Sequence, residues 1–189
     1  MLEWFGHDGV KLAALFALLL AASGLDLATR RIPNWLCLIG LCTGLMLQAL
    51  LEGALGFGLG CAGAVTGLVV FLPLYVIATV GAGDVKLVAA VGAFVGPGGA
   101  LLAAIASTMA AGIVGILVIA SHGDLRRFFA RYGVMLRDFI RTGHVLYIAP
   151  APNEAARLRI AYAPAILLGT LMSQWFLGQL DPLISRLEF

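Results

Sequence analysis

Charged residues are scarce in this chain: they make up only 12% of its 189 residues, whereas hydrophobic residues make up 61%. A soluble domain normally carries about 25% charged residues. This shortage, together with several apolar stretches close to the length of a membrane span, excludes an ordinary soluble domain. It indicates a helical protein that crosses a membrane several times.

Cysteine and histidine are also few, with three residues of each. Cys37, Cys42 and Cys61 lie in apolar runs without CxxC spacing, so they predict neither a zinc site nor a disulfide framework. The three histidines are scattered and share no spacing typical of metal ligands. We therefore expect no metal and no cofactor.

The apolar segments predict an all-α membrane protein with six transmembrane helices, at residues 10–25, 35–51, 57–80, 85–96, 100–120 and 161–179. The fourth segment is too short to cross a core of about 30 Å at about 1.5 Å per residue unless protein surrounds its flanking loops. Nothing suggests a second domain, so residues 1–189 are expected to form one.

The basic residues are distributed unevenly over the six-span arrangement. Lys11 and Arg186 fall on one side, and all the others fall on the opposite side: Arg30, Arg31, Lys86, Arg126, Arg127, Arg131, Arg137, Arg141, Arg157 and Arg159. Because cytoplasmic loops carry the excess of Lys and Arg, the second side is expected to be cytoplasmic. Both termini are then expected outside.

The interval 121–160 contains an amphipathic basic helix between the fifth and sixth spans. Its apolar residues recur with helical spacing: Leu125, Phe128, Phe129, Tyr132, Leu136, Phe139 and Ile140. Arginines fill most of the intervening positions, so the lipid bilayer is the simplest partner. Nucleic-acid binding is not expected, because an anionic leaflet already accounts for the charge. A role in gripping a substrate or partner protein is the alternative.

Two aspartates stand out at the cytoplasmic ends of the predicted spans. Asp26 closes the first span, and Asp84 follows Gly81 and Gly83 at the start of the fourth. An acid at the centre of a membrane helix costs about 2.5–3.5 kcal/mol, and such residues usually face the protein interior and mark function. For Asp84 the structural alternative is that it caps a helix N-terminus.

The residues around the aspartates have expected roles of their own. Gly81 and Gly83 permit unusual backbone dihedrals and close approach of a substrate strand. Lys86 either raises the local positive potential or extends to the membrane interface. Pro33 separates the first two spans, and Asn34 is placed to cap the second.

Two converging carboxylates suit peptide hydrolysis. Because two acids a few ångströms apart cannot both ionise readily, one holds a proton while the other accepts a proton from water. The pair then acts as acid and base together, without a metal.

These residues resemble a known family. Gly81-Ala82-Gly83-Asp84-Val85-Lys86-Leu87 is similar to the Gly-x-Gly-Asp-x-Lys-Leu signature of the type IV prepilin leader peptidases, which are intramembrane aspartyl proteases. Asp26 with Arg31-Ile32-Pro33-Asn34 resembles the first catalytic aspartate of that family and its Ile-Pro-Asn. Residues 159–165 resemble the segment that precedes its last span.

The resemblance implies an endopeptidase of the bacterial inner membrane that removes basic leaders from prepilins or pseudopilins at the cytoplasmic face. Asp26 and Asp84 would be catalytic, Gly81, Gly83 and Lys86 would form the active-site loop, and Pro33 and Asn34 would support it. The pilus assembly machinery is a further possible partner. The chain resembles the short form of tight-adherence (Flp-type) pilus systems. It lacks the CxxC pairs of larger members, so N-methyltransferase activity is not carried over.

Two other classes of function compete with this interpretation. A proton- or cation-coupled carrier would use buried acids as a relay, and it predicts pseudo-symmetric halves with broken helices. A non-catalytic membrane scaffold for pilus assembly predicts that neither carboxylate is needed.

Overall fold

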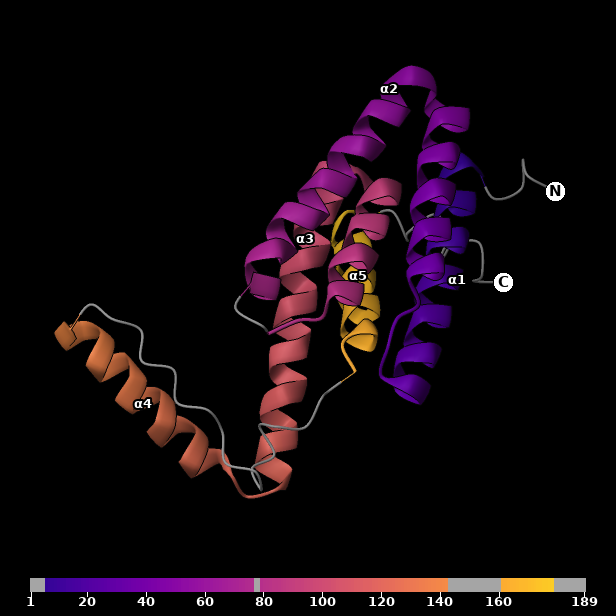
Figure 1. Cartoon of the computed structure of the whole chain (residues 1–189). Coiled ribbons are helices and arrows are strands. Elements are labelled where there is room, and N and C mark those ends of the chain that lie inside the picture. Colours follow the sequence, from indigo (N-terminus) through magenta and orange to yellow (C-terminus); the bar gives the residue numbers. More distant parts are fainter. Residues whose placement is uncertain (1–5, 77–78, 143–160, 179–189) are drawn as a thin grey trace. The chain divides into compact units, whose positions relative to one another are not determined.

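The computed structural model describes residues 6–76, 79–142 and 161–178, and this part of the chain forms five helices (Figure 1). They are α1 (Gly6–Thr29), α2 (Asn34–Val76), α3 (Ala82–Ser121), α4 (Leu125–Thr142) and α5 (Ala163–Phe176). The chain divides into two compact units, which we describe separately: Met1–Ala111 with Ala161–Phe189, and Gly112–Ile160.

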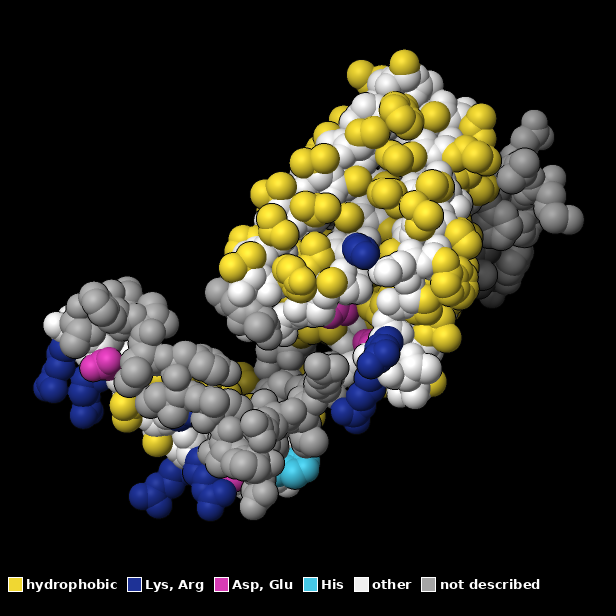
Figure 2. All heavy atoms as spheres, in the orientation of Figure 1, with side chains coloured by type: hydrophobic (Ala, Val, Ile, Leu, Met, Phe, Trp, Pro, Cys, Tyr) yellow, Lys and Arg dark blue, Asp and Glu magenta, His cyan; other side chains and the backbone are white. Residues whose placement is uncertain are grey.

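Within the described ranges, three helices are long and apolar enough to cross a membrane, namely Gly9–Thr29 within α1, all of α2 and all of α3. The surface of the first unit is apolar as well: Leu50, Leu55 and Val76 are 69%, 77% and 74% exposed. Figure 2 shows such hydrophobic side chains spread over one face of this unit. A surface of this kind is suited to contact with lipid, so the fold supports a membrane protein.

α2 and α3 each contain one glycine with non-helical backbone. Gly53 has φ 68° and ψ −151°, and Gly96 has φ 71° and ψ −178°. A positive φ lies in the region that glycine enters without a steric penalty. A straight helix of the 43 residues of α2 would extend about 65 Å. Instead α2 turns back at Gly53, and Figure 1 shows its two arms meeting at an apex.

The second arm of α2 lies against the first arm of α3 with backbone touching backbone. A Cβ added to Gly63 would collide with the carbonyl of Gly92, and a Cβ on Gly92 would collide with that of Gly63. A Cβ on Gly67 would lie 2.6 Å from the carbonyl oxygen of Val88. Only residues without side chains permit this approach, which is the usual means of packing helices in lipid.

α5 runs antiparallel to the second arm of α3. Near the start of α5, Tyr162 accepts or donates a hydrogen bond with Thr108. Further along, the Ser107 hydroxyl lies 3.5 Å from the carbonyl of Ile166. Gln174, near the end of α5, lies 3.8 Å from the position of a Cβ on Gly99. The return of α3 after Gly96 therefore brings its second arm down along α5.

The core of the first unit lies between α1, α2, α3 and α5. α1 packs against both α5 and α2. Leu15, Leu19 and Ala22 of α1 and Phe71 of α2 have no exposed surface. At the far end of α1, the Lys11 ammonium donates a 2.6 Å hydrogen bond to Glu52 just before the turn at Gly53. These contacts hold α1 along its whole length.

The second unit contains α4, which begins one turn after α3 ends. The carbonyl of Asp124 accepts the N–H of Phe128 at 2.9 Å, and its carboxylate pairs with Arg127 at 3.3 Å. α4 coincides with the amphipathic helix that the sequence predicts between the fifth and sixth spans.

The prediction of an all-α fold is confirmed, but the number of helices differs. Six spans and one surface helix were expected, whereas the described residues form five helices. The second and third spans are continuous as α2, and the fourth and fifth as α3, because a single glycine makes each turn where a loop was expected. In the region of the last expected span, α5 covers Ala163–Phe176 rather than residues 161–179, and residue 179 lies outside the described residues.

The glycine contact between α2 and α3 predicts a specific effect on stability. Gly63→Ala should destabilise the protein by about 1–3 kcal/mol, since its methyl group meets the Gly92 backbone. Gly58→Ala, on the same helix with open space around its Cβ, is the matched control and should be neutral or slightly stabilising. Thermal unfolding of both variants in detergent measures the difference, and equal melting temperatures would contradict the close contact.

Candidate functional site

Asp26 lies in the last part of α1 and is buried, with 6% of its surface exposed. Its Oδ2 accepts a 3.0 Å hydrogen bond from the backbone N–H of Ala163, the first residue of α5. Tyr162, at the N-cap of α5, makes no side-chain capping bond. The Asp26 carboxylate therefore supplies, from another helix, the acceptor that a helix N-terminus requires.

Asp84 is the third residue of α3 and is partly buried. Its Oδ2 accepts the N–H of Gly81 at 2.9 Å, while its own N–H donates to the Gly81 carbonyl at 3.1 Å. The structural alternative from the sequence was thus partly right: Asp84 stabilises the helix start, but from the third helical position and not from the N-cap.

The two carboxylates lie near enough to interact electrostatically. Each is placed at the positive end of a helix dipole, Asp84 in the first turn of α3 and Asp26 at the first N–H of α5. In each carboxylate Oδ2 is held by one backbone N–H, while Oδ1 has no hydrogen bond to any residue that the structure describes. Within the described part of the chain, each carboxylate is thus oriented through Oδ2, and Oδ1 remains an acceptor.

The glycine turn before α3 packs against the segment that joins α1 to α2. A Cβ on Gly83 would lie 3.1 Å from the Cβ of Ile32 and 3.4 Å from its carbonyl oxygen. The Cys37 thiol donates a weak hydrogen bond to the Gly83 carbonyl, with an S···O distance of 3.7 Å. The two sequence motifs, far apart along the chain, therefore form one structure, and Gly83 is a point of close contact within it.

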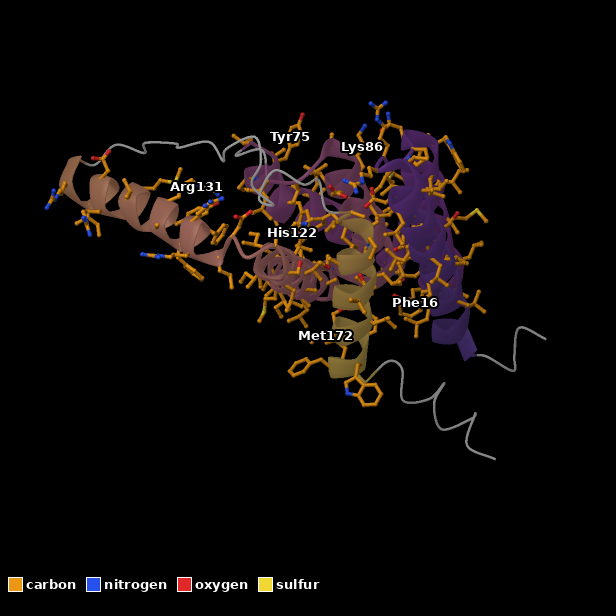
Figure 3. All side chains as sticks on the ribbon, turned by 90° about the horizontal axis from the view of Figure 1, so that it is seen from below. Phe16, Tyr75, Lys86, His122, Arg131 and Met172 are labelled. Carbon is orange, nitrogen blue, oxygen red and sulfur yellow. The ribbon has the colours of Figure 1, made fainter. Side chains whose placement is uncertain are left out.

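Lys86 joins the same two motifs on the exposed side. Its ammonium donates a 2.9 Å hydrogen bond to Oδ1 of Asn34, and Figure 3 labels Lys86 near the beginning of α3. Asn34 was expected to cap α2, but it is the first residue of that helix. The carbonyl of Pro33 accepts the first N–H groups, those of Leu36 at 3.1 Å and Cys37 at 3.4 Å. The Asn34 side chain holds Lys86 and does not cap α2.

Sequence reasoning missed the contribution of α5. Ala163 provides the N–H that holds Asp26, and Tyr162 next to it makes an edge-to-face contact with Phe71 at 5.9 Å and bonds to Thr108. Tyr162 is also within electrostatic range of Asp84. The similarity of residues 159–165 to a family segment was the available signal, but it indicated no contact with Asp26.

The arrangement offers carboxylates and backbone groups rather than a metal-ligand set. Among the residues that the structure describes, no three His, Cys, Asp or Glu side chains come together. What the site can do chemically is accept and donate protons at two carboxyl groups within electrostatic reach of each other, one buried and one partly buried.

Comparison with known proteins identifies the family of the part of the chain that contains this site. The model of the type IV leader peptidase family matches residues 4–116, which is more than half of the chain and includes both aspartates and the glycine turn. A search of curated proteins and a search of solved structures each found no match. The family match shows that the chain belongs to the type IV leader peptidase family, a family of proteases.

Proposed function

We propose that this peptidase is an aspartyl endopeptidase whose catalytic groups are Asp26 and Asp84. The observation that carries the proposal is their placement: a carboxylate on α1 and one on α3 lie within electrostatic reach of each other, and among the described residues each is hydrogen-bonded through Oδ2. An orienting bond to Oδ2 leaves Oδ1 of each group for water and for the scissile amide. No cofactor is needed for this chemistry.

The reaction uses the pair as base and acid. The ionised carboxylate takes a proton from water as the water oxygen attacks the carbonyl carbon of the scissile bond. The protonated carboxyl gives its proton to the amide nitrogen, and the carbon–nitrogen bond breaks to release a carboxyl and an amine. One proton enters the pair and one leaves it, so the pair regains its starting charge. The titration belongs to the pair, and neither aspartate is assigned as the first base.

The helix N-termini around the two carboxylates stabilise the negative charge of the pair. The pair carries one negative charge in a setting with little water, where an uncompensated charge is expensive. The N-termini of α3 and α5 present partial positive charge to it, and their N–H groups contact the carboxylates directly. The hydrogen bond of Lys86 to Asn34 keeps a cation at the rim of the same site.

The glycine turn is proposed to shape the approach of the substrate. Gly81 and Gly83 keep side chains away from Asp84. The opposing wall is the segment around Pro33 and Asn34, because Ile32 contacts Gly83 and Asn34 bonds to Lys86. An extended peptide can then lie with its scissile bond beside the carboxylates. We infer that Gly81, Gly83 and Lys86 are active-site loop residues and that Pro33 and Asn34 support them.

We propose six membrane crossings. Asn34 at the start of α2 contacts Lys86 near the start of α3, so the intervening 43-residue helix must leave this end and return to it. The turn at Gly53 accomplishes this, and the turn at Gly96 does the same for α3. With α1 and α5, two crossings each by α2 and α3 give six, and the excess of basic residues supports a cytoplasmic location for the site.

The proposed substrates are prepilins or pseudopilins of the bacterial inner membrane, from which the basic leader is removed. This follows from the family to which the chain belongs and from the position of the site at the end of the spans. A leader that is cleaved at the membrane border presents its bond at that depth. N-methylation of the new terminus is not part of the proposal.

Replacing either aspartate by asparagine should strongly reduce processing. Asp26→Asn and Asp84→Asn keep an oxygen that accepts the N–H of Ala163 or Gly81, so the fold is retained while proton transfer is lost. Cleavage should fall on the order of 10²–10⁴-fold. The measurement is leader removal from a co-expressed candidate pilin, read by mass.

Asp138→Asn on α4 is the control acid for this experiment and should process normally. Normal processing by either the Asp26 or the Asp84 variant would exclude the pair as the catalytic centre. It would favour the scaffold alternative, in which the carboxylates are not needed.

Gly83→Leu should impair cleavage through the geometry of the turn. The new side chain would push the segment at Ile32 away, and a displacement near 1 Å at a catalytic group costs on the order of 10²-fold. Gly24→Leu is the matched control, because Gly24 lies two residues from Asp26 with open space around its Cβ. Equal turnover by the two variants would show that Gly83 is not part of the active-site geometry.

Single cysteines test the topology in a chain whose own three cysteines are replaced. Positions 8 and 98 should react with a membrane-impermeant thiol reagent from outside, and position 124 should react only after permeabilisation. The six-crossing arrangement requires this pattern, since 98 follows the turn at Gly96 and 124 follows the end of α3. The reverse labelling would contradict it.

A further inference from the structure

α4 presents two different faces, and its apolar face is uncovered among the described residues. Phe129, Tyr132 and Ile140 are 61%, 50% and 75% exposed, and at about 100° per residue they fall on one side of the helix. The arginines fall on the other side and its flanks: Arg126, Arg127, Arg131, Arg137 and Arg141. A helix in water does not normally keep large apolar side chains this exposed along one face.

The aromatic residues and the arginines of α4 contact one another. Phe128 lies edge-on to Phe129 at 5.6 Å and close to Tyr132 at 4.6 Å. The guanidinium of Arg131 lies over Tyr132 at 5.4 Å from the ring centre, and Figure 3 labels Arg131 on this helix. A cation beside aromatic rings at the border of an apolar face matches the boundary between lipid headgroups and acyl chains.

The chain keeps α4 close to the bilayer. α3 ends at Ser121 and α4 begins at Leu125, so only three residues separate them. Three residues extend at most about 11 Å. Because α3 is apolar enough to cross a membrane, the start of α4 is confined to the neighbourhood of a membrane surface.

We propose that α4 lies in the plane of the membrane surface, with Phe129, Tyr132 and Ile140 in the headgroup–acyl boundary and its arginines on the phosphates of anionic lipids. The net positive charge of α4 favours anionic lipid as the partner, because α4 carries five arginines and one acid, Asp138. A second protein is the competing occupant. The proposal goes beyond the peptidase chemistry and does not depend on it.

The experiment uses two exposed β-branched residues of α4 as a matched pair. Ile140 belongs to the apolar face, whereas Val134, which is 50% exposed, lies among the arginines. A nitroxide label is attached to a single cysteine at 140 or at 134 in the full chain, with the native cysteines replaced. The protein is held in lipid nanodiscs containing phosphatidylglycerol, and collisions with oxygen and with a water-soluble nickel chelate are measured.

The label at 140 should collide severalfold more with oxygen relative to nickel than the label at 134. Nickel access at 140 equal to that at 134 would overturn the proposal, because the apolar face would then be in water. Shielding of 140 from both reagents would also overturn it, since a protein would then cover the face. Neither measurement requires peptidase activity, so failure here is distinct from failure of the proposed function.

The apolar face has a second test. With the label at 129, Ile140→Glu should reduce the preference for oxygen over nickel, whereas Val134→Glu should leave it unchanged, although both add the same charge to the same helix.

The role of lipid charge is tested separately. Exchanging phosphatidylglycerol for zwitterionic phosphatidylcholine should reduce the oxygen preference severalfold. Equal depth in the two lipids would overturn the role of anionic lipid.

Discussion

The arrangement of the first unit depends on the contact between the backbones of Gly63 and Gly92. Because neither residue has a side chain, the second arm of α2 lies directly against the first arm of α3. With the two arms packed in this way, the start of α3 lies beside the start of α2, where Gly83 contacts Ile32 and Lys86 bonds to Asn34. Helix packing in lipid relies on such close approach, since lipid removes the hydrophobic drive between helices.

Both candidate carboxylates have a structural role beside the chemical role proposed for them. Asp84 stabilises the turn from which its own helix starts, and Asp26 holds the first N–H of α5, a helix 137 positions away in sequence. The same bonds that order the helix ends also orient the acids. These bonds explain how two ionisable groups are tolerated in a chain with so few charges, because each carboxylate accepts a backbone N–H at the start of a helix.

The parts of the site set by local sequence could be predicted, and the parts set by distant contacts could not. Asp84 and its glycines form a turn within four residues, and the family resemblance indicated Asp26. The bond from Ala163 to Asp26 and that from Lys86 to Asn34 join distant residues, which no periodicity in one sequence indicates. The turns at Gly53 and Gly96 were expected as loops, because hydropathy does not distinguish a one-residue reversal from a longer break.

α5 has 14 residues, and a helix of this length extends only about 21 Å, whereas the hydrocarbon layer of a bilayer is about 30 Å thick. The arm of α3 that begins at Ala82 and ends before Gly96 is equally short. If both cross the membrane, this hydrophobic mismatch favours a locally thinner bilayer beside the two helices, both of which begin at the site of Asp26 and Asp84. Water and a polar peptide then reach the carboxylates without passing through a full layer of acyl chains.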